Sequence, residues 1–129
     1  MDFLDKKIAP PRSWEKFEDL SRALFGSIYR DKLARKNGRT GQPQHGVDVF
    51  VEPFDAPGTW IGIQCKGKNG GYLSKPKIAE FDAELAKAEG AEPALGRWIF
   101  ATTAPDDEKL LAHARKVSSA RQARGAFPV

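Results

Sequence analysis

Residues 46–66 read GVDVFVEPFDAPGTWIGIQCK and contain the clearest strand pattern of the chain. Two runs rich in β-branched and aromatic residues, 47–52 and 59–66, flank a segment at 53–58 that contains two prolines and a glycine. Runs of this composition on either side of turn residues are typical of two strands joined in a hairpin. The stretch therefore predicts a β-hairpin.

Each strand of this hairpin is predicted to have one apolar face and one partly polar face, because side chains alternate along a strand. The apolar faces would carry Val47, Val49 and Val51 on the first strand and Ile61, Ile63 and Cys65 on the second. The opposite faces would carry Asp48 and Phe50, and Gly62, Gln64 and Lys66. A hairpin register can place Asp48 beside Gln64 and Lys66, and Gly62 would leave room for a group approaching the sheet.

The rest of the chain predicts three helices and one more strand. The helices are expected from an N-cap at Ser13 to about Tyr29, over 76–89 and over 105–121, and a dense apolar strand is expected over 95–102, in the centre of the sheet. Loops are expected at 36–46 and 67–75, and the apolar tail 126–129 resembles the beginning of a further, truncated strand. The order αββαβα predicts an α/β sandwich, a mixed central sheet flanked by helices. We expect residues 1–129 to be a single domain from the N-terminal part of a longer protein.

Composition narrows the class of protein. The chain is 40% hydrophobic and contains one cysteine, Cys65, so neither disorder nor a structural zinc site is expected. It lacks an apolar run of 18 residues, which predicts a soluble, cytoplasmic protein without membrane contact. The net charge is +4, with basic residues gathered at 28–41, 66–77 and 115–124. Such grouping is typical of a surface for a phosphate backbone, although solvated surface charge explains it equally well.

Asp48, Gln64 and Lys66 form the candidate catalytic group. Mg²⁺ prefers oxygen ligands and commonly takes only one or two carboxylates from a protein, so Asp48 and the amide oxygen of Gln64 suit it. Lys66 would orient the attack on a phosphate and stabilise negative charge. Glu18, at the border of the first helix's apolar stripe, could hold the metal's waters or a second metal. Mn²⁺ is expected to substitute for Mg²⁺.

Several segments together resemble a known nuclease superfamily. Gly38-Arg39-Thr40-Gly41-Gln42, Gln44-His45-Gly46-Val47-Asp48 and Gly62-Ile63-Gln64-Cys65-Lys66 are similar to the PD-(D/E)xK superfamily, and more closely to its Mrr-like restriction branch with a D…QxK motif. The segment 14–20 resembles that family's first helix, with Glu18 at the position of its glutamate, and 100–105 resembles the strand-to-helix segment after the core. The resemblance covers about residues 13–120.

The resemblance implies an αβββαβ topology, Mg²⁺-dependent hydrolysis of phosphodiester bonds and DNA, in double-stranded form, as the substrate. Domains of this kind are often N-terminal effectors of bacterial antiphage proteins, so we expect a homo-oligomer or attachment to further domains. Nucleic-acid contacts are expected from Arg35, Lys36, Arg39, Gln42, Gln44, His45 and Lys68.

Plainer interpretations stay open at each position. Asp48 could cap a turn or pair with Lys66, and Glu18 could be a surface ion-pair partner. His45 suits a turn or phosphate contact better than a general base, and Cys65 suits a small core residue better than a nucleophile. A catalytically inactive nuclease fold that binds nucleic acid is the alternative function, and a structural or protein-interaction domain is the third class.

Overall fold

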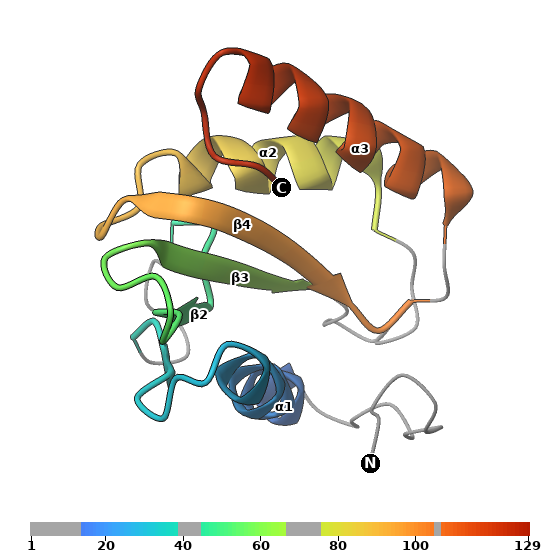
Figure 1. Cartoon of the computed structure of the whole chain (residues 1–129). Helices are drawn as coiled ribbons and strands as arrows, with labels where there is room; N and C mark the ends of the chain where they lie inside the picture. The colour runs from blue at the N-terminus through green and yellow to red at the C-terminus, as the bar shows by residue number, and fades with distance from the viewer. Residues whose placement is uncertain (1–13, 39–44, 67–75, 105–106) are drawn as a thin grey trace.

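The computed structural model describes residues 14–38, 45–66, 76–104 and 107–129. In chain order these residues form α1 (Trp14–Ile28), β1 (Arg35–Lys36), β2 (Val49–Val51), β3 (Trp60–Lys66), α2 (Ile78–Ala88), β4 (Leu95–Thr102) and α3 (Glu108–Ala123). The architecture is α/β, with one mixed four-stranded sheet between helices. Figure 1 shows α1 on one face of this sheet and α2 and α3 on the other.

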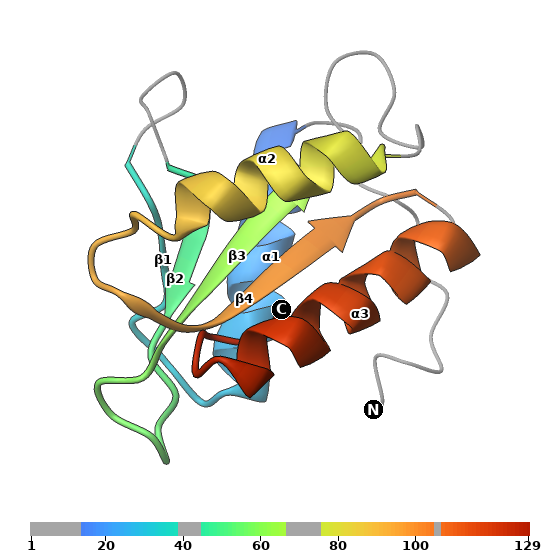
Figure 2. The same cartoon turned by 90° about the horizontal axis from the view of Figure 1, so that it is seen from above.

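The sheet has the strand order β1-β2-β3-β4. β2 and β3 pair antiparallel with Val49 opposite Ile63, which confirms the predicted hairpin. β3 and β4 pair parallel. Parallel neighbours need a long crossover, and α2 provides it. Figure 2 shows α2 and α3 lying over the same face of the sheet, with α1 beneath it.

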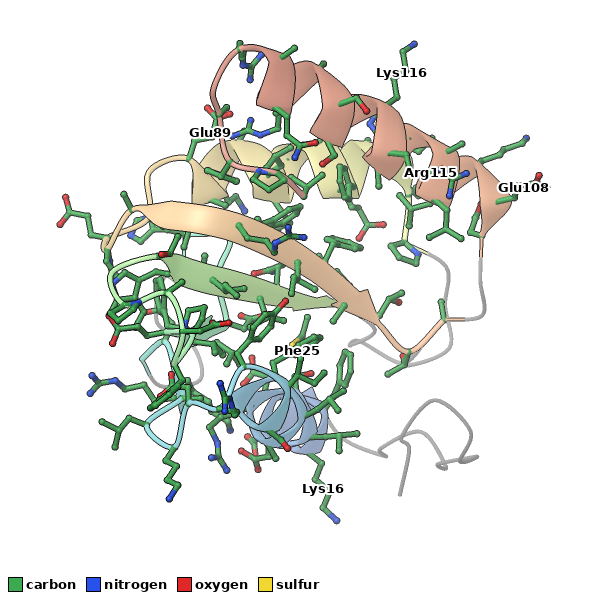
Figure 3. The ribbon with its side chains drawn as sticks, viewed as in Figure 1. Lys16, Phe25, Glu89, Glu108, Arg115 and Lys116 are labelled. Carbon is green, nitrogen blue, oxygen red and sulfur yellow. The ribbon has the colours of Figure 1, made fainter. Side chains whose placement is uncertain are left out.

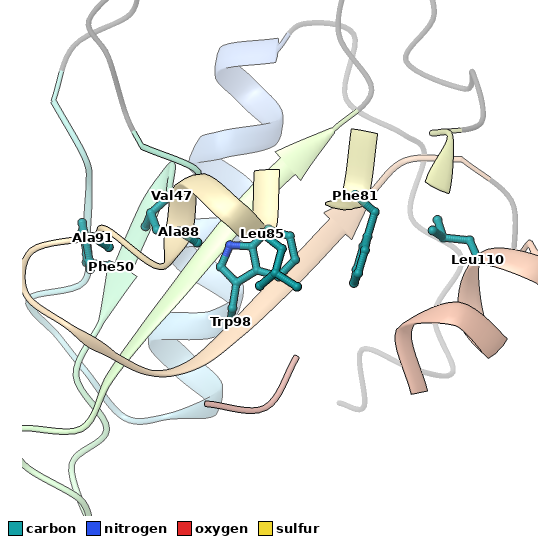
Figure 4. Packing of buried hydrophobic residues seen from close by; sticks show 8 residues of the cluster. All are labelled: Val47, Phe50, Phe81, Leu85, Ala88, Ala91, Trp98 and Leu110. Carbon is teal, nitrogen blue, oxygen red and sulfur yellow. The ribbon is translucent and has the colours of Figure 1, made fainter. Parts of the chain in front are cut away.

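Two hydrophobic clusters fill the space between the layers. The cluster beneath α2 and α3 is shown in Figure 4 and consists of Val47, Phe50, Phe81, Leu85, Ala88, Ala91, Trp98 and Leu110. The cluster beneath α1 consists of Phe17, Ala34, Val49, Val51, Ile61, Ile63 and Cys65. Figure 3 shows Phe25 directed from α1 toward the sheet and Lys16 directed away from it, as the amphipathic spacing of this helix requires.

Polar contacts fix α3 against α2. Asp107 is the N-cap of α3, and its Oδ1 accepts hydrogen bonds from the amides of Lys109 and Leu110 at 3.0 and 3.2 Å. His113 Nε2 lies 2.7 Å from Asp82 Oδ1 on α2 and its ring packs edge-on against Phe81. His113 thus links α3 to α2 through one polar and one aromatic contact.

Two expectations about the sheet need correction. The loop expected at 36–46 is confirmed at its described residues 37, 38, 45 and 46, but its first residue, Lys36, belongs to the unpredicted strand β1, in which Arg35 and Lys36 pair with Phe50 and Val49. β4 was expected in the centre, but it lies at the edge of the described sheet. Its apolar composition reflects the covering of its faces, since Trp98 belongs to the cluster under α2 and α3.

The tail 126–129 forms no strand in the described part of the chain. It nevertheless lies along the edge of β4, because the Trp98 amide donates a hydrogen bond to the Pro128 carbonyl at 3.0 Å. The Val129 amide donates to Ser118 Oγ at 3.2 Å, which ties the tail to α3 as well. Among the helices of the described residues, none is both long and apolar enough to cross a membrane.

Candidate metal and nucleic-acid site

Asp48 is buried between β1 and β3, at the start of β2. Its side chain is 1% exposed, and its Oδ2 accepts a hydrogen bond from the Cys65 amide at 2.8 Å. Its own amide donates to the Ile63 carbonyl at 2.8 Å, and its carbonyl accepts from the Asn37 amide at 2.7 Å. The Asp48 carboxylate thus takes the place of a backbone carbonyl as the acceptor for the Cys65 amide of β3. It lies beside the backbone between Gln64 and Lys66.

The chain around Asp48 departs from regular strand alternation. The Asp48 amide bonds to the Ile63 carbonyl although Val49 is the residue paired with Ile63, a pattern characteristic of a β-bulge. The expectation that Val47 shares a face with Val49 and Val51 is therefore wrong. Val47 packs under α2, whereas Val49 and Val51 pack under α1. The bulge directs the Asp48 side chain toward the backbone of β3 at Cys65.

Gly46 explains why the chain turns toward α2 immediately before the bulge. Its φ is +75°, and a Cβ at this position would lie 2.3 Å from the Glu84 carbonyl oxygen. Its own carbonyl accepts a hydrogen bond from Trp98 Nε1 at 2.8 Å. Only glycine combines this backbone conformation with so close an approach of a helix. α2 therefore packs directly on the segment that positions Asp48.

Gln64 has a buried polar atom for which the described residues supply no hydrogen bond. The residue is 7% exposed, and its Oε1 has no hydrogen-bond partner among the described residues. Gln64 alternates with Gly62 and Lys66 on the face of β3 that α2 covers. Buried polar atoms are nearly always paired, and an exception in a folded protein commonly marks a bound water or ion.

The space expected at Gly62 is filled by protein side chains. A Cβ at Gly62 would lie 2.9 Å from side-chain atoms of both Val47 and Leu95. The expectation that Gly62 leaves room for an approaching group is therefore wrong. The glycine allows Val47, displaced by the bulge, to pack against the strand.

Lys66 reaches the helix α2. Its Nζ lies 3.4 Å from Glu84 Oε1, and the two side chains are 17% and 13% exposed. The same oxygen lies 3.4 Å from the Nζ of Lys87, one helical turn further on. Glu84 was not among the residues that the sequence singled out. Its spacing from Phe81, Leu85 and Ala88 places it at the border of the buried stripe of α2, and that position was the available signal.

Glu18 and Lys36 lie on the opposite, α1 side of the sheet. Glu18 is 3% exposed, more deeply buried than its border position predicted, and Lys36 Nζ lies 3.9 Å from its Oε1. Lys36 Nζ lies 2.8 Å from Asp19 Oδ1. The hydrogen bond to Asp19 raises the pKa of Lys36 above its usual value, with further contributions from the charges of Asp19, Glu18 and Glu15. Lys36, predicted to contact DNA, is thus already paired with acids.

Cys65 is a core residue, as expected. It is fully buried under α1, and its Sγ donates to Ser21 Oγ at 3.5 Å. The pKa of the Cys65 thiol is raised from 9.0 to about 12, mainly by burial; the hydrogen bond to Ser21 lowers it, the charges of Asp48 and Glu18 raise it, and the charge of Lys36 lowers it. These effects show that Asp48, Glu18 and Lys36 lie within electrostatic range of one buried atom.

The remaining predicted nucleic-acid contacts are only partly described. Arg35 is exposed on β1, and His45 is exposed with a φ of +50°, consistent with a turn. His45 lines a cavity of about 320 Å³ together with Asn37, Phe50, Gly90, Ala91 and Glu92. Arg39, Gln42, Gln44 and Lys68 lie outside the described residues.

The donor set suits a hard cation better than a soft one. In the described part of the chain, no three His, Cys, Asp or Glu side chains are grouped so that they could hold a metal ion. Mg²⁺ does not need such a group, because one or two carboxylates, neutral oxygens and waters satisfy it. Gln64 Oε1, which lacks a hydrogen-bond partner among the described residues, and the Asp48 carboxylate, held by the amide of the next residue, Cys65, are oxygen donors of the kind that such a ligand set uses.

Comparison of the chain with protein-family models, curated proteins and solved structures finds no match.

Proposed function

We propose that this chain is a metal-dependent DNA endonuclease domain that hydrolyses phosphodiester bonds. The observation that supports this proposal best is the buried amide oxygen of Gln64, which has no hydrogen-bond donor among the described residues. It lies one residue from Cys65, whose amide holds the buried carboxylate of Asp48. A structural role for Gln64 would supply a donor to this oxygen, whereas a ligand role requires the oxygen to be available.

Each residue has a distinct part in the proposed reaction. Asp48 and Gln64 would hold Mg²⁺, whereas Glu18 lies on the α1 side of the sheet, opposite the face that carries Gln64 and Lys66, and is left out of this ligand set. The metal supplies Lewis-acid activation of the phosphodiester and of the attacking water. Lys66, at the end of β3, would bind the scissile phosphate and offset the charge that develops on it. Mn²⁺ has the same preference for oxygen ligands and would replace Mg²⁺.

The biological setting follows from the resemblance to the Mrr-like nucleases. On that basis the substrate is double-stranded DNA, and the domain acts as the effector of a bacterial restriction or antiphage system. Catalysis would then require a homo-oligomer or further domains that bring two copies onto the DNA. Arg35, which is exposed on β1, would contact the phosphate backbone of this DNA.

The proposal is tested by incubating the purified chain with supercoiled plasmid in Mg²⁺, in Mn²⁺ and in excess EDTA. Nicked and linear DNA should appear with either metal and not with EDTA. Asp48→Asn and Lys66→Met should each lower the cleavage rate by about 10²-fold or more, the usual scale for one preorganised electrostatic group. Asn retains an oxygen that accepts from the Cys65 amide, so folding should persist.

Asp55→Asn is the matched control, because this acid is exposed in the turn of the same hairpin and belongs to neither the predicted site nor a core cluster. It should cut as the unmodified chain does. DNA binding without cleavage in both metals would refute the nuclease proposal and favour the inactive binding module.

A further inference from the structure

The side chain of Lys66 needs an external restraint to act as a precise phosphate ligand. A lysine has four rotatable bonds, and fixing it costs up to about 2 kcal/mol of side-chain entropy. Lys66 is the last residue of β3, and the residues that follow it, 67–75, lie outside the described part of the chain. The strand therefore fixes the position of its Cα but leaves the ammonium group to be placed by a neighbour.

Glu84 is in a position to provide this restraint. Its Oε1 lies 3.4 Å from Lys66 Nζ, and its side chain is 13% exposed, so water competes only weakly for the contact. The backbone of α2 around Glu84 is itself fixed, because Phe81, Leu85 and Ala88 are buried in the core. A carboxylate on a rigid helix thus holds a cation at the end of a strand.

The same turn of α2 also determines where Asp48 lies. A Cβ on Gly46 would lie 2.3 Å from the carbonyl oxygen of Glu84 and 2.8 Å from the amide nitrogen of Ala88. Gly46 precedes Asp48 by two residues, and the bulge is at Asp48. One helical turn therefore contacts both the segment that places the carboxylate and the side chain of the lysine.

Lys87 keeps this arrangement electrically suitable for a phosphate. Its Nζ lies 3.4 Å from the same Oε1 of Glu84, and its side chain is 60% exposed. Two lysines and one glutamate leave one net positive charge, so Glu84 can restrain Lys66 without cancelling the attraction for DNA.

From this geometry we infer that Glu84 is the positioning residue for Lys66, and that it aligns the lysine with the metal ligands through α2. The inference rests on the proposed nuclease function for its catalytic consequence. It predicts that removal of the Glu84 carboxylate impairs turnover more than it impairs DNA binding.

The test compares Glu84→Met and Glu84→Gln with Asp82→Asn as the control. Met and Gln have similar lengths and favour helices as Glu does, but only Gln retains an oxygen that accepts from Lys66. Asp82 is an acid on the same helix whose Oδ1 lies 2.7 Å from His113 Nε2 instead. Thermal unfolding verifies that all three proteins remain folded.

In Mg²⁺, Glu84→Met should lower kcat for plasmid cleavage by about 10- to 100-fold, the scale of a misplaced catalytic group, with KM for DNA unchanged or lower. Glu84→Gln should recover part of kcat, and Asp82→Asn should leave kcat and KM at the values of the unmodified chain. Loss expressed as a raised KM with kcat unchanged would overturn the inference.

A second measurement does not depend on cleavage. Amine acetylation followed by mass spectrometry reports the reactivity of Lys66 relative to the exposed Lys109 in the same molecule. Glu84→Met should increase this ratio, and Asp82→Asn should not. An unchanged ratio would overturn the inference even if the unmodified chain cuts DNA. If the chain does not cut DNA, the proposed function fails, and the acetylation ratio still decides whether Glu84 restrains Lys66.

Discussion

Replacing Gln64 by Leu should make the metal-free protein more stable. Gln64 is 7% exposed and its Oε1 has no hydrogen-bond partner among the described residues. A buried polar group without a partner costs about 1–3 kcal/mol, and an apolar side chain of similar size removes that cost. In EDTA, urea titration should therefore give Gln64→Leu a free energy of unfolding about 1–3 kcal/mol above that of the unmodified chain.

The order should change when metal is added. A ligand present at 100 times its dissociation constant stabilises the folded state by about 2.7 kcal/mol. The unmodified chain should gain this amount in Mg²⁺, while Gln64→Leu should gain less because it lacks the oxygen ligand. The stability difference seen in EDTA should therefore close or reverse. Gln64→Glu should be the least stable of the three in EDTA, because it buries a charge, and should gain the most from Mg²⁺.

Gln122→Leu is the matched control, since Gln122 is exposed on α3 and its replacement should change neither titration by more than about 0.5 kcal/mol. A lower free energy of unfolding for Gln64→Leu than for the unmodified chain in EDTA would contradict an unsatisfied Gln64 oxygen. That result would mean that the Gln64 oxygen has a structural partner. An equal gain in Mg²⁺ for both proteins would exclude Gln64 as a ligand.

Three further predictions follow from the charges and the buried thiol. Arg35→Ala should reduce the magnitude of the slope of log affinity for duplex DNA against log salt by about 0.9, because one phosphate contact is lost. Lys36→Ala should change this slope less, since Lys36 is already paired with Asp19 at 2.8 Å. Iodoacetamide should fail to modify Cys65 in the folded protein at pH 8 and should modify it in urea, because burial raises the pKa of this thiol to about 12; rapid modification of the folded protein would contradict the buried position. Because that pKa is raised from 9.0, the unfolded chain loses the thiol proton first, so the free energy of unfolding should fall as pH rises from 9.0 toward about 12, and Cys65→Ala should show a smaller fall over the same window.

Local patterns in the sequence predicted most of the elements. The β-branched and aromatic runs at 47–52 and 59–66, separated by turn residues, were sufficient for the hairpin, although both faces of its strands are buried. The strand at 95–102 was recovered as β4 with the same bounds. Its position in the sheet was predicted wrongly. An apolar run indicates that both faces of a strand are covered, but it does not indicate which strands pair with it.

Long-range contacts account for what local patterns missed. The bulge at Asp48 depends on Gly46, whose carbonyl bonds to Trp98 in β4 and whose Cα lies against α2. β1 is two residues long and exists only because β2 offers it a partner. The contact between Lys66 and Glu84 likewise joins residues that no local period relates. The candidate residues were identified from chemistry and resemblance, but their mutual orientation required the packing of α2.

The central claim, that Asp48 and Gln64 form a divalent-cation site, is tested most directly by titrating Mn²⁺ into ¹⁵N-labelled protein. Paramagnetic Mn²⁺ broadens the amide signals of residues close to it, so the spectrum locates the ion without any assay of activity. We expect selective loss of the signals of Asp48, Cys65 and Lys66, while those of Phe54 and Leu111, which lie exposed at the hairpin turn and on α3, persist. In Asp48→Asn the same signals should persist at the same Mn²⁺ concentration. Broadening centred elsewhere, or equally strong at Phe54 and Leu111, would contradict the claim.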